Sequence, residues 1–414
     1  MIVPLMEAVA DTCGGKAGAL GALLRAGLPV PDGFVVSFAA YLDAVRDPDL
    51  GRFAGRPDDP DAIRQAIEAR PVHATVIDAL GRALDELGDP PVAVRSSAAN
   101  EDTGQASAAG QHESFLAVHG VSEVAEAVRA CWASLFSPRA VDYRDASVRA
   151  DQPSDDLMMA VIVQRHLDAE ASGVMFTPAD PDDPTRIEAS WGLGPSVVEG
   201  KVTPDAYRVT GDRSVTRAVA DKRTRLDRRG TRLVIRDVPT RIRNQPAIDD
   251  ATATRLAGLG KEIAALLGGP QDIEWAIADG RTWILQARPV TAAPPPASPR
   301  GTCDTPAAAL TGTPGSRGIV TGIARIVRGP GDFARVRPGD ILVCPFTDPA
   351  WTPLLRIAAG VVTETGGVLS HAAIVAREHA IPAVLGVPDA TGRLHDDTVI
   401  TVDGTTGTVT ATNA

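Results

Sequence analysis

The stretch TGGVLSHAAIVAREHAIPAVLGV, residues 365–387, places His371 between a glycine pair and an apolar helical pattern. Two interpretations follow, because His371 is either a chemical participant or the polar start of a buried helix. Around it, short apolar runs predict strands, and the run that begins at His371 predicts a helix. The strand runs are GIVTGIARIV, DILVCPF, GVVTE, PAVLGV and VITVDGTTGTVT. The sequence therefore predicts a compact module at residues 301–414, with strands flanked by a few helices.

The bulk composition narrows the class of protein. A chain of 414 residues predicts two to three domains at roughly 150 residues each. The net charge of −11 and the 4% aromatic content argue against a nucleic-acid partner. The four cysteines form no C-x-x-C pair, which fits a reducing cytoplasm. We expect no membrane span and no export signal, because no apolar run approaches the ~20 residues of a spanning helix.

A proline-rich segment, TAAPPPASPR at residues 291–300, predicts a semi-rigid linker of ~3.1 Å per residue. Before it, residues 1–290 alternate strand-like and helical patterns, which indicates a mixed α/β region with two lobes. The expected strands are PVAVRSS, MMAVIVQ, SGVMFT, DIEWAI and TWILQARPV, and the expected helices are AGALGALLRAG and ATRLAGLGKEIAALL. The basic stretch DKRTRLDRRGTRLVIR is expected to be a solvated hairpin.

Two glycine-containing segments are candidates for phosphate contact. Lys16 follows two glycines before a helical pattern, and glycine, helix N–H groups and lysine together suit a phosphate. A turn before a surface helix explains the same residues. Arg95 lies where the strand VAVRSS meets a long loop of small residues, where it is able to grip a phosphate bidentately. For Arg95 the alternative is a plain surface loop. Arg139 and Arg144 follow in SLFSPRAVDYR, and a solvated helix face explains them equally well.

The segment PQDIEWAIADGRTWILQARPV, residues 270–290, gives a sharper signal. Its ADG turn predicts a tight hairpin that sets Glu274 beside Gln286. Arg288 should point to the same face as Gln286, because side chains alternate along a strand. Carboxylate and amide oxygens are ligands that Mg²⁺ accepts beside nucleotide phosphates. An exposed hairpin face with ordinary salt bridges is the alternative.

Taken in this order, residues 1–290 resemble the ATP-grasp nucleotide-binding domain of the phosphoenolpyruvate synthase and pyruvate phosphate dikinase family. The resemblance extends through CWASLFSPRAVDYR and WGLGPSVVEGKVTPDAY. It implies that ATP and Mg²⁺ bind here. The resemblance implies that Lys16, Arg95 and Arg139 contact the phosphates and that Gln164 lies in the strand beside the adenine. It also implies that Glu274 and Gln286 hold Mg²⁺. Arg288 is implied to reach the transferring phosphoryl group.

The C-terminal segment resembles the swivelling β/β/α phosphohistidine domain of the same family, which is related to rifampicin phosphotransferase. TGG, SHAA, ARE and IPAV all occur in order, so His371 is implied as the phosphoryl carrier. A phosphoryl group there would lie at a helix N-terminus, which stabilises negative charge. Ser370 either caps this helix or bonds the phosphoryl oxygens. Leu369 stands where plant-type dikinases carry a regulatory threonine, and we therefore expect regulation through that threonine to be absent. His379 and His395 are expected at the surface.

The resemblance omits the family's phosphoenolpyruvate-binding barrel, which we do not find in this sequence. It implies an AMP-forming phosphotransferase of the dikinase type, with Arg95, Arg288 and His371 catalytic and a small-molecule acceptor. Two other hypotheses are kept. The chain is the ATP-and-histidine subunit of a split dikinase that needs a separate acceptor-binding protein, or it is a phosphorelay or regulatory binding protein. The second phosphate acceptor, water or inorganic phosphate, stays open.

Overall fold

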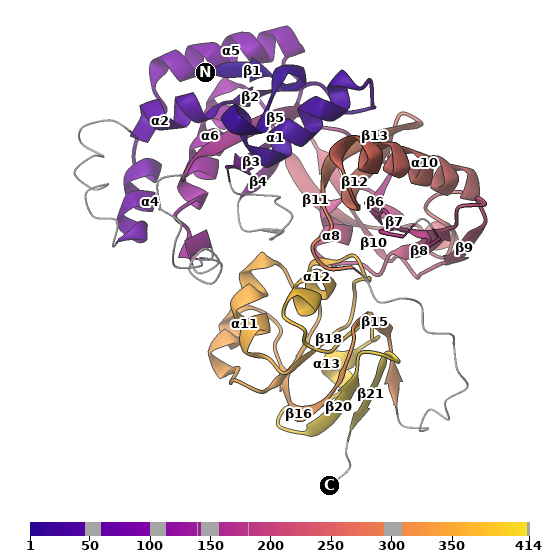
Figure 1. Cartoon of the computed structure of the whole chain (residues 1–414). Coiled ribbons are helices and arrows are strands. Elements are labelled where there is room, and N and C mark those ends of the chain that lie inside the picture. Colours follow the sequence, from indigo (N-terminus) through magenta and orange to yellow (C-terminus); the bar gives the residue numbers. More distant parts are fainter. Residues whose placement is uncertain are drawn as a thin grey trace. The chain divides into compact units, whose positions relative to one another are not determined.

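The fold comes from a computed structural model that describes most of the chain. The described residues are 1–45, 59–99, 113–138, 140–141, 157–180, 182–293 and 309–411. They form two compact units, which are described separately below (Figure 1). Unit 1 comprises residues 1–170, 227–235 and 258–289, and unit 2 comprises residues 171–226, 236–257 and 290–414.

Unit 1 is built on an antiparallel five-stranded sheet. Its order is β1 (Ile2–Pro4), β2 (Gly33–Val36), β5 (Met159–Arg165), β3 (Val92–Ala98) and β4 (Ser114–Val118). One face packs against α2 (Phe38–Val45), α4 (Pro60–Glu68), α5 (Ala74–Leu87) and α6 (Val121–Ser134). Every second residue of β3 and β5 lies in that core, including Val94 and Val163. The intervening residues therefore point to the other face.

A long helix and a hairpin complete unit 1. Helix α1 (Ala10–Arg25) follows the short η1 (Leu5–Glu7) and packs against β3, β5 and β13. Strands β12 (Gln271–Ala278) and β13 (Arg281–Pro289) form the expected antiparallel hairpin. Asp279 and Gly280 at its turn have φ of 51° and 68°, which is the left-handed geometry of a type I′ turn.

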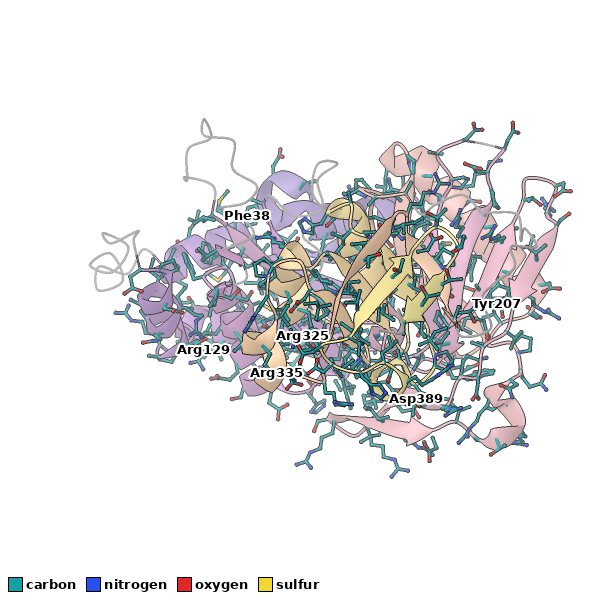
Figure 2. The ribbon with its side chains drawn as sticks, turned by 90° about the horizontal axis from the view of Figure 1, so that it is seen from below. Phe38, Arg129, Tyr207, Arg325, Arg335 and Asp389 are labelled. Carbon is teal, nitrogen blue, oxygen red and sulfur yellow. The ribbon has the colours of Figure 1, made fainter. Side chains whose placement is uncertain are left out.

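In unit 2, β6 (Ala171–Phe176), β7 (Thr185–Trp191), β8 (Asp205–Val209) and β9 (Val215–Ala218) pair in chain order and antiparallel. The short helices α8 (Pro195–Val198) and α9 (Thr240–Arg243) belong to the same unit. The Tyr207 hydroxyl donates to the Ile248 carbonyl at 2.9 Å, which ties β8 to the segment before α10 (Asp250–Leu267). Figure 2 labels Tyr207 on this sheet.

The basic stretch DKRTRLDRRGTRLVIR was expected to be a solvated hairpin. It contains β10 (Thr224–Arg229) and most of β11 (Arg232–Asp237), which pair with each other, and most of its side chains are exposed. The interpretation was wrong for Lys222, which precedes the hairpin and is fully buried. Its ammonium group lies 2.6 Å from the Asp205 carboxylate, which is equally buried. A buried ammonium needs such a partner, because desolvation is costly.

The histidine module of unit 2 is built on an eight-stranded sheet of order β14-β21-β20-β16-β17-β18-β19-β15. Its strands are β14 (Leu310–Thr311), β15 (Thr313–Ser316), β16 (Ile319–Ile326), β17 (Ile341–Cys344), β18 (Gly360–Thr363), β19 (Ala383–Leu385), β20 (Val399–Asp403) and β21 (Thr408–Ala411). The four central strands β16 to β19 run parallel, and the outer pairs are antiparallel.

Helices cover the histidine module on both faces of its central strands. These are η3 (Pro330–Arg335), η4 (Pro349–Trp351), α11 (Thr352–Ile357), α12 (His371–Glu378) and α13 (Ala390–Arg393). Leu342 of β17 lies in one core with α11 and α12, and Val343 lies in the other with α13. Burial on both faces explains why these strands are continuous apolar runs. Arg325 of β16 and Arg335 both pair with Asp396. Figure 2 labels the two arginines.

The expected secondary structure is confirmed for each quoted strand and helix run. The mixed α/β and α+β architecture is confirmed too. Residues 294–308, which hold most of the proline-rich segment, lie outside the described residues. The domain bounds at residues 290 and 300 therefore stay predictions.

Candidate active site

The face of the five-stranded sheet in unit 1 that packs against α1 presents two of the predicted residues. Arg95 of β3 and Gln164 of β5 both alternate with core residues, so both side chains point to this face. Gln164 is 2% exposed and donates to the Pro31 carbonyl at 2.9 Å. Arg95 is one of the few charged residues on these buried strands. A guanidinium group that is largely removed from water requires a hydrogen-bonding partner.

The glycine-lysine turn packs on the end of β3. Gly14 interrupts α1 with φ 81°, so helical geometry resumes beside Gly15 and Lys16. A Cβ on Gly14 would lie 2.3 Å from the Ser97 carbonyl oxygen, and only glycine permits that approach. The Ala17 amide donates to the Ser97 hydroxyl at 3.1 Å. The turn that carries Lys16 is thereby fixed against the strand that carries Arg95.

The hairpin brings Glu274 and Gln286 together as predicted, since the two residues are direct cross-strand partners. Arg95 bridges them. Its Nη2 lies 3.1 Å from Glu274 Oε2 and 2.5 Å from Gln286 Oε1, while its Nη1 donates to the Leu285 carbonyl at 2.8 Å. Two oxygens that converge on one cationic nitrogen form a donor pair suited to a cation.

Arg288 lies two residues farther along β13 and is 8% exposed. Its Nε and Nη2 contact Asp272 Oδ2 at 2.9 and 2.8 Å, and the two residues are cross-strand partners. The forked contact fixes the guanidinium plane. Asp272 was not singled out from the sequence, and the β-bulge between Glu274 and Trp275 is what sets it opposite Arg288.

Arg139, the third predicted phosphate contact, lies outside the described residues, as does Arg144. Among the residues that the structure describes, no three His, Cys, Asp or Glu side chains gather as a metal cluster. Glu274 with Gln286 supplies one carboxylate and one amide oxygen. That pair fits a Mg²⁺ ion whose remaining ligands are waters and phosphate oxygens, which is how Mg²⁺ is usually held beside nucleotides.

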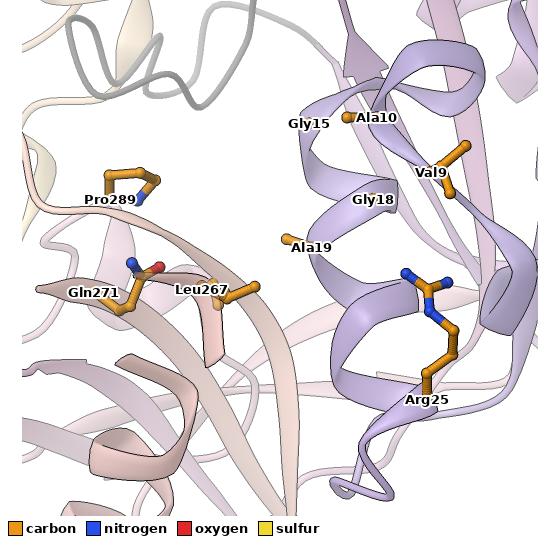
Figure 3. A pocket seen from close by; sticks show the side chains of 10 residues that line it. Val9, Ala10, Gly15, Gly18, Ala19, Arg25, Leu267, Gln271 and Pro289 are labelled. Carbon is orange, nitrogen blue, oxygen red and sulfur yellow. The ribbon is translucent and has the colours of Figure 1, made fainter. Parts of the chain in front are cut away.

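A pocket of about 320 Å³ lies beside α1 and holds none of the predicted site residues (Figure 3). Its lining is Val9, Ala10, Gly15, Gly18, Ala19, Arg25, Leu267, Gln271, Ala287 and Pro289. The Arg25 guanidinium already donates to the Met6 and Ala8 carbonyls at 2.6 and 3.1 Å. The lining lacks the convergent cations that a triphosphate requires.

In unit 2, His371 is the first residue of α12 and is 4% exposed. Thr347 Oγ1 lies 3.1 Å from its Nδ1, and Thr352 Oγ1 lies 3.4 Å from its Nε2. Two hydroxyls on opposite ring nitrogens fix the orientation of the imidazole. Both threonines lie in the segment TDPAWT, and nothing in their spacing alone marked them as partners of His371.

The structure places both residues that precede His371. Ser370 occupies the N-cap position, but its hydroxyl donates to the Gly367 carbonyl at 2.8 Å and makes no cap hydrogen bond. Leu369 is 1% exposed and packs in an apolar cluster with Val174 and Val202. His379 and His395 are exposed, as expected.

The structure therefore defines a multidomain α/β protein with a cationic cluster on an antiparallel sheet and a histidine at a helix N-terminus of a separate module. The family described as "Pyruvate phosphate dikinase, AMP/ATP-binding domain" matches residues 10–301, and "PEP-utilising enzyme, mobile domain" matches residues 336–407. The chain belongs to this pyruvate phosphate dikinase and PEP-utilising enzyme family, as the resemblance implied.

Relatives of known name are similar over nearly the whole chain. The probable phosphoenolpyruvate synthase of Methanothermobacter thermautotrophicus is 37% identical over 422 residues, covering 96% of this chain and 61% of that protein. The phosphoenolpyruvate synthases of Aeropyrum pernix and Pyrococcus furiosus are each 35% identical, covering 96% of this chain and 56% of those proteins. The chain thus spans somewhat more than half the length of these relatives. Across the described residues, no helix is both long and apolar enough for a membrane span.

Proposed function

We propose that the chain is an ATP-dependent phosphotransferase of the dikinase type, which forms AMP and passes the β-phosphoryl group through His371 to a small-molecule acceptor. The observation that carries the proposal is the convergence of Arg95, Glu274 and Gln286 on one face of unit 1. The family match to an AMP/ATP-binding domain supports the nucleotide.

In this proposal Lys16, Arg95, Arg139 and Arg288 neutralise the phosphates of ATP, and Gln164 lies beside the adenine. Phosphoryl transfer requires mainly positioning and charge neutralisation, which fixed guanidinium groups supply. Asp272 holds the fork of Arg288 in place and so acts as a positioning residue. Glu274 and Gln286 hold Mg²⁺, which when bound neutralises charge that develops on the phosphate oxygens.

The phosphoryl carrier is His371. We propose Nε2 as the reactive nitrogen, because its contact with Thr352 Oγ1 at 3.4 Å is the longer of the two and its lone pair is more easily released. This places the proton on Nδ1, beside Thr347 Oγ1. The lone pair attacks the β-phosphorus, the bond to AMP breaks, and the γ-phosphoryl group then leaves to water or inorganic phosphate. The β-phosphoryl group stays on the ring at the N-terminus of α12, where backbone N–H groups favour negative charge.

The acceptor proposed first is pyruvate or another small α-keto acid, because the similar proteins are named phosphoenolpyruvate synthases. A second candidate is that turnover needs an acceptor-binding domain on another protein. This chain spans 56–61% of the length of those relatives.

The test incubates the purified chain with ATP, Mg²⁺ and pyruvate and measures AMP. We expect one AMP per chain without an acceptor, because transfer to His371 is then the last step, and repeated turnover when the acceptor is present. Turnover that begins only when a separate acceptor-binding protein is added would establish the second candidate. A folded chain that makes ADP and no AMP under all these conditions would contradict the dikinase reaction itself.

A further inference from the structure

A buried carboxylate holds the loop that precedes His371. Glu188 lies on β7 and is 2% exposed. Its Oε1 accepts the Val368 amide at 2.6 Å, and its Oε2 accepts the Leu369 amide at 3.2 Å. We call residues 365–370 the TGG loop. The contact joins two parts of unit 2 that lie 180 residues apart in the sequence.

The surfaces around this contact fit closely. A Cβ on Gly367 would lie 2.3 Å from each Glu188 oxygen, so any larger residue would displace the carboxylate. Gly200, with φ 67°, approaches Ser370 so closely that a Cβ would meet the Ser370 Cβ at 3.3 Å. Thr365 Oγ1 donates to the Gly200 carbonyl at 2.6 Å. Backbone groups and the Glu188 carboxylate thus join the β6–β9 part of unit 2 to the TGG loop.

The apolar part of this contact is small. It consists of Val174, Phe176, Val197, Val202, Leu369 and Ile374, with three half-buried valines around them. The polar contacts therefore carry a large share of the attachment. His371 is 4% exposed in this arrangement, and the proposed delivery of a phosphoryl group to an acceptor requires the module that carries it to move.

We propose that Glu188 is a docking residue, whose carboxyl group holds the TGG loop and His371 against the β6–β9 sheet and whose ionisation loosens that hold. The proposal deepens the proposed function and rests on it, because phosphoryl transfer through His371 is what requires the histidine module to move. Its physical basis is that both carboxylate oxygens accept backbone amides of the TGG loop. The loop comes this close because Gly367 has no side chain.

Burial raises the pKa of Glu188 from 4.5 to about 7. The Val368 and Leu369 amides, Arg377 of α12 and Arg186 of β7 oppose this rise in pKa, but desolvation outweighs them. Once the loop leaves, the solvated carboxyl returns to its ordinary pKa. Docking therefore takes up a proton, so it weakens as pH rises from about 4.5 to about 7 and stays level above that.

The test is amide hydrogen exchange of peptides covering residues 365–371 in the full chain without nucleotide, at about pH 5 and about pH 8. The proteins are the wild type, Glu188→Gln and Glu188→Ala. Dividing the wild-type rate by the Glu188→Gln rate at each pH removes the intrinsic pH dependence of exchange. Asp212→Asn is the matched control, because the hydrogen bonds of Asp212 within the described part of the chain go to Thr210 and Ser214 in the β8–β9 turn.

We expect this ratio to be at least tenfold higher at the upper pH than at the lower pH, since glutamine keeps one acceptor oxygen for the loop amides and does not ionise. Glu188→Ala should exchange faster than Glu188→Gln at both pH values. A ratio that is the same at both pH values overturns the proposal. Because no ATP is present, this outcome is independent of whether His371 is phosphorylated.

Discussion

At the scale of single residues, the account depends on one guanidinium group. The sequence predicted that Glu274 and Gln286 are partners, and the structure pairs them. The two-residue turn alone would set Glu274 opposite Leu285, and a β-bulge between Glu274 and Trp275 shifts the register by one residue. The sequence did not predict that Arg95 would bridge them, since it lies 179 residues before Glu274 and only the tertiary fold brings them together. Glu188 was missed for the same reason. Its partners are backbone amides, which no side-chain motif announces.

Replacing Arg95 with lysine should lower kcat/KM for ATP by about 100-fold. Lysine keeps the charge but has no planar fork, so it cannot contact Leu285, Glu274 and Gln286 at once. Steady-state AMP formation measures the effect. Arg129→Lys is the control, because Arg129 pairs with Glu126 on the surface of α6. Equal kinetics for both variants would remove Arg95 from the proposed ATP site.

At the scale of elements, apolar periodicity was a sufficient guide to the strands and helices. The central strands of the histidine module were predictable because burial on both faces leaves unbroken apolar runs such as DILVCPF. Helix α1 shows what periodicity misses. The sequence did not predict the helical segment that begins at Ala10, but the turn and following helix that it indicated agree with the break at Gly14 within Ala10–Arg25. The cause is the close approach to Ser97, which local sequence does not encode.

Gly14→Ala should lower the free energy of unfolding by about 2–4 kcal/mol. The added Cβ meets the Ser97 carbonyl at 2.3 Å, and φ 81° is unfavourable for alanine. Gly258→Ala is the matched change, because Gly258 lies inside α10 with no atom near its would-be Cβ, and it should stabilise by ~0.5–1 kcal/mol. Urea denaturation measures both. A neutral Gly14→Ala would mean that α1 does not approach β3 in this way.

At the scale of the whole molecule, the predicted ATP residues that the structure describes lie in unit 1, and His371 lies in unit 2. The sequence predicted a nucleotide region followed by a histidine module, and both family matches follow that order. The compact units do not follow chain order, since residues 171–226 group with the histidine module. Such grouping arises from contacts such as that of Glu188 with the TGG loop. Sequence reasoning had no access to contacts between segments so far apart.

The most direct test of the central claim is to locate the phosphoryl group by peptide mass spectrometry after the full chain reacts with ATP and Mg²⁺. The account predicts an acid-labile phosphoryl group on His371, formed together with one AMP, and its loss in His371→Ala. His379→Ala is the control, because His379 is an exposed histidine at the end of the same helix, and it should keep the adduct. AMP formation with His371 unmodified throughout the reaction would contradict the account.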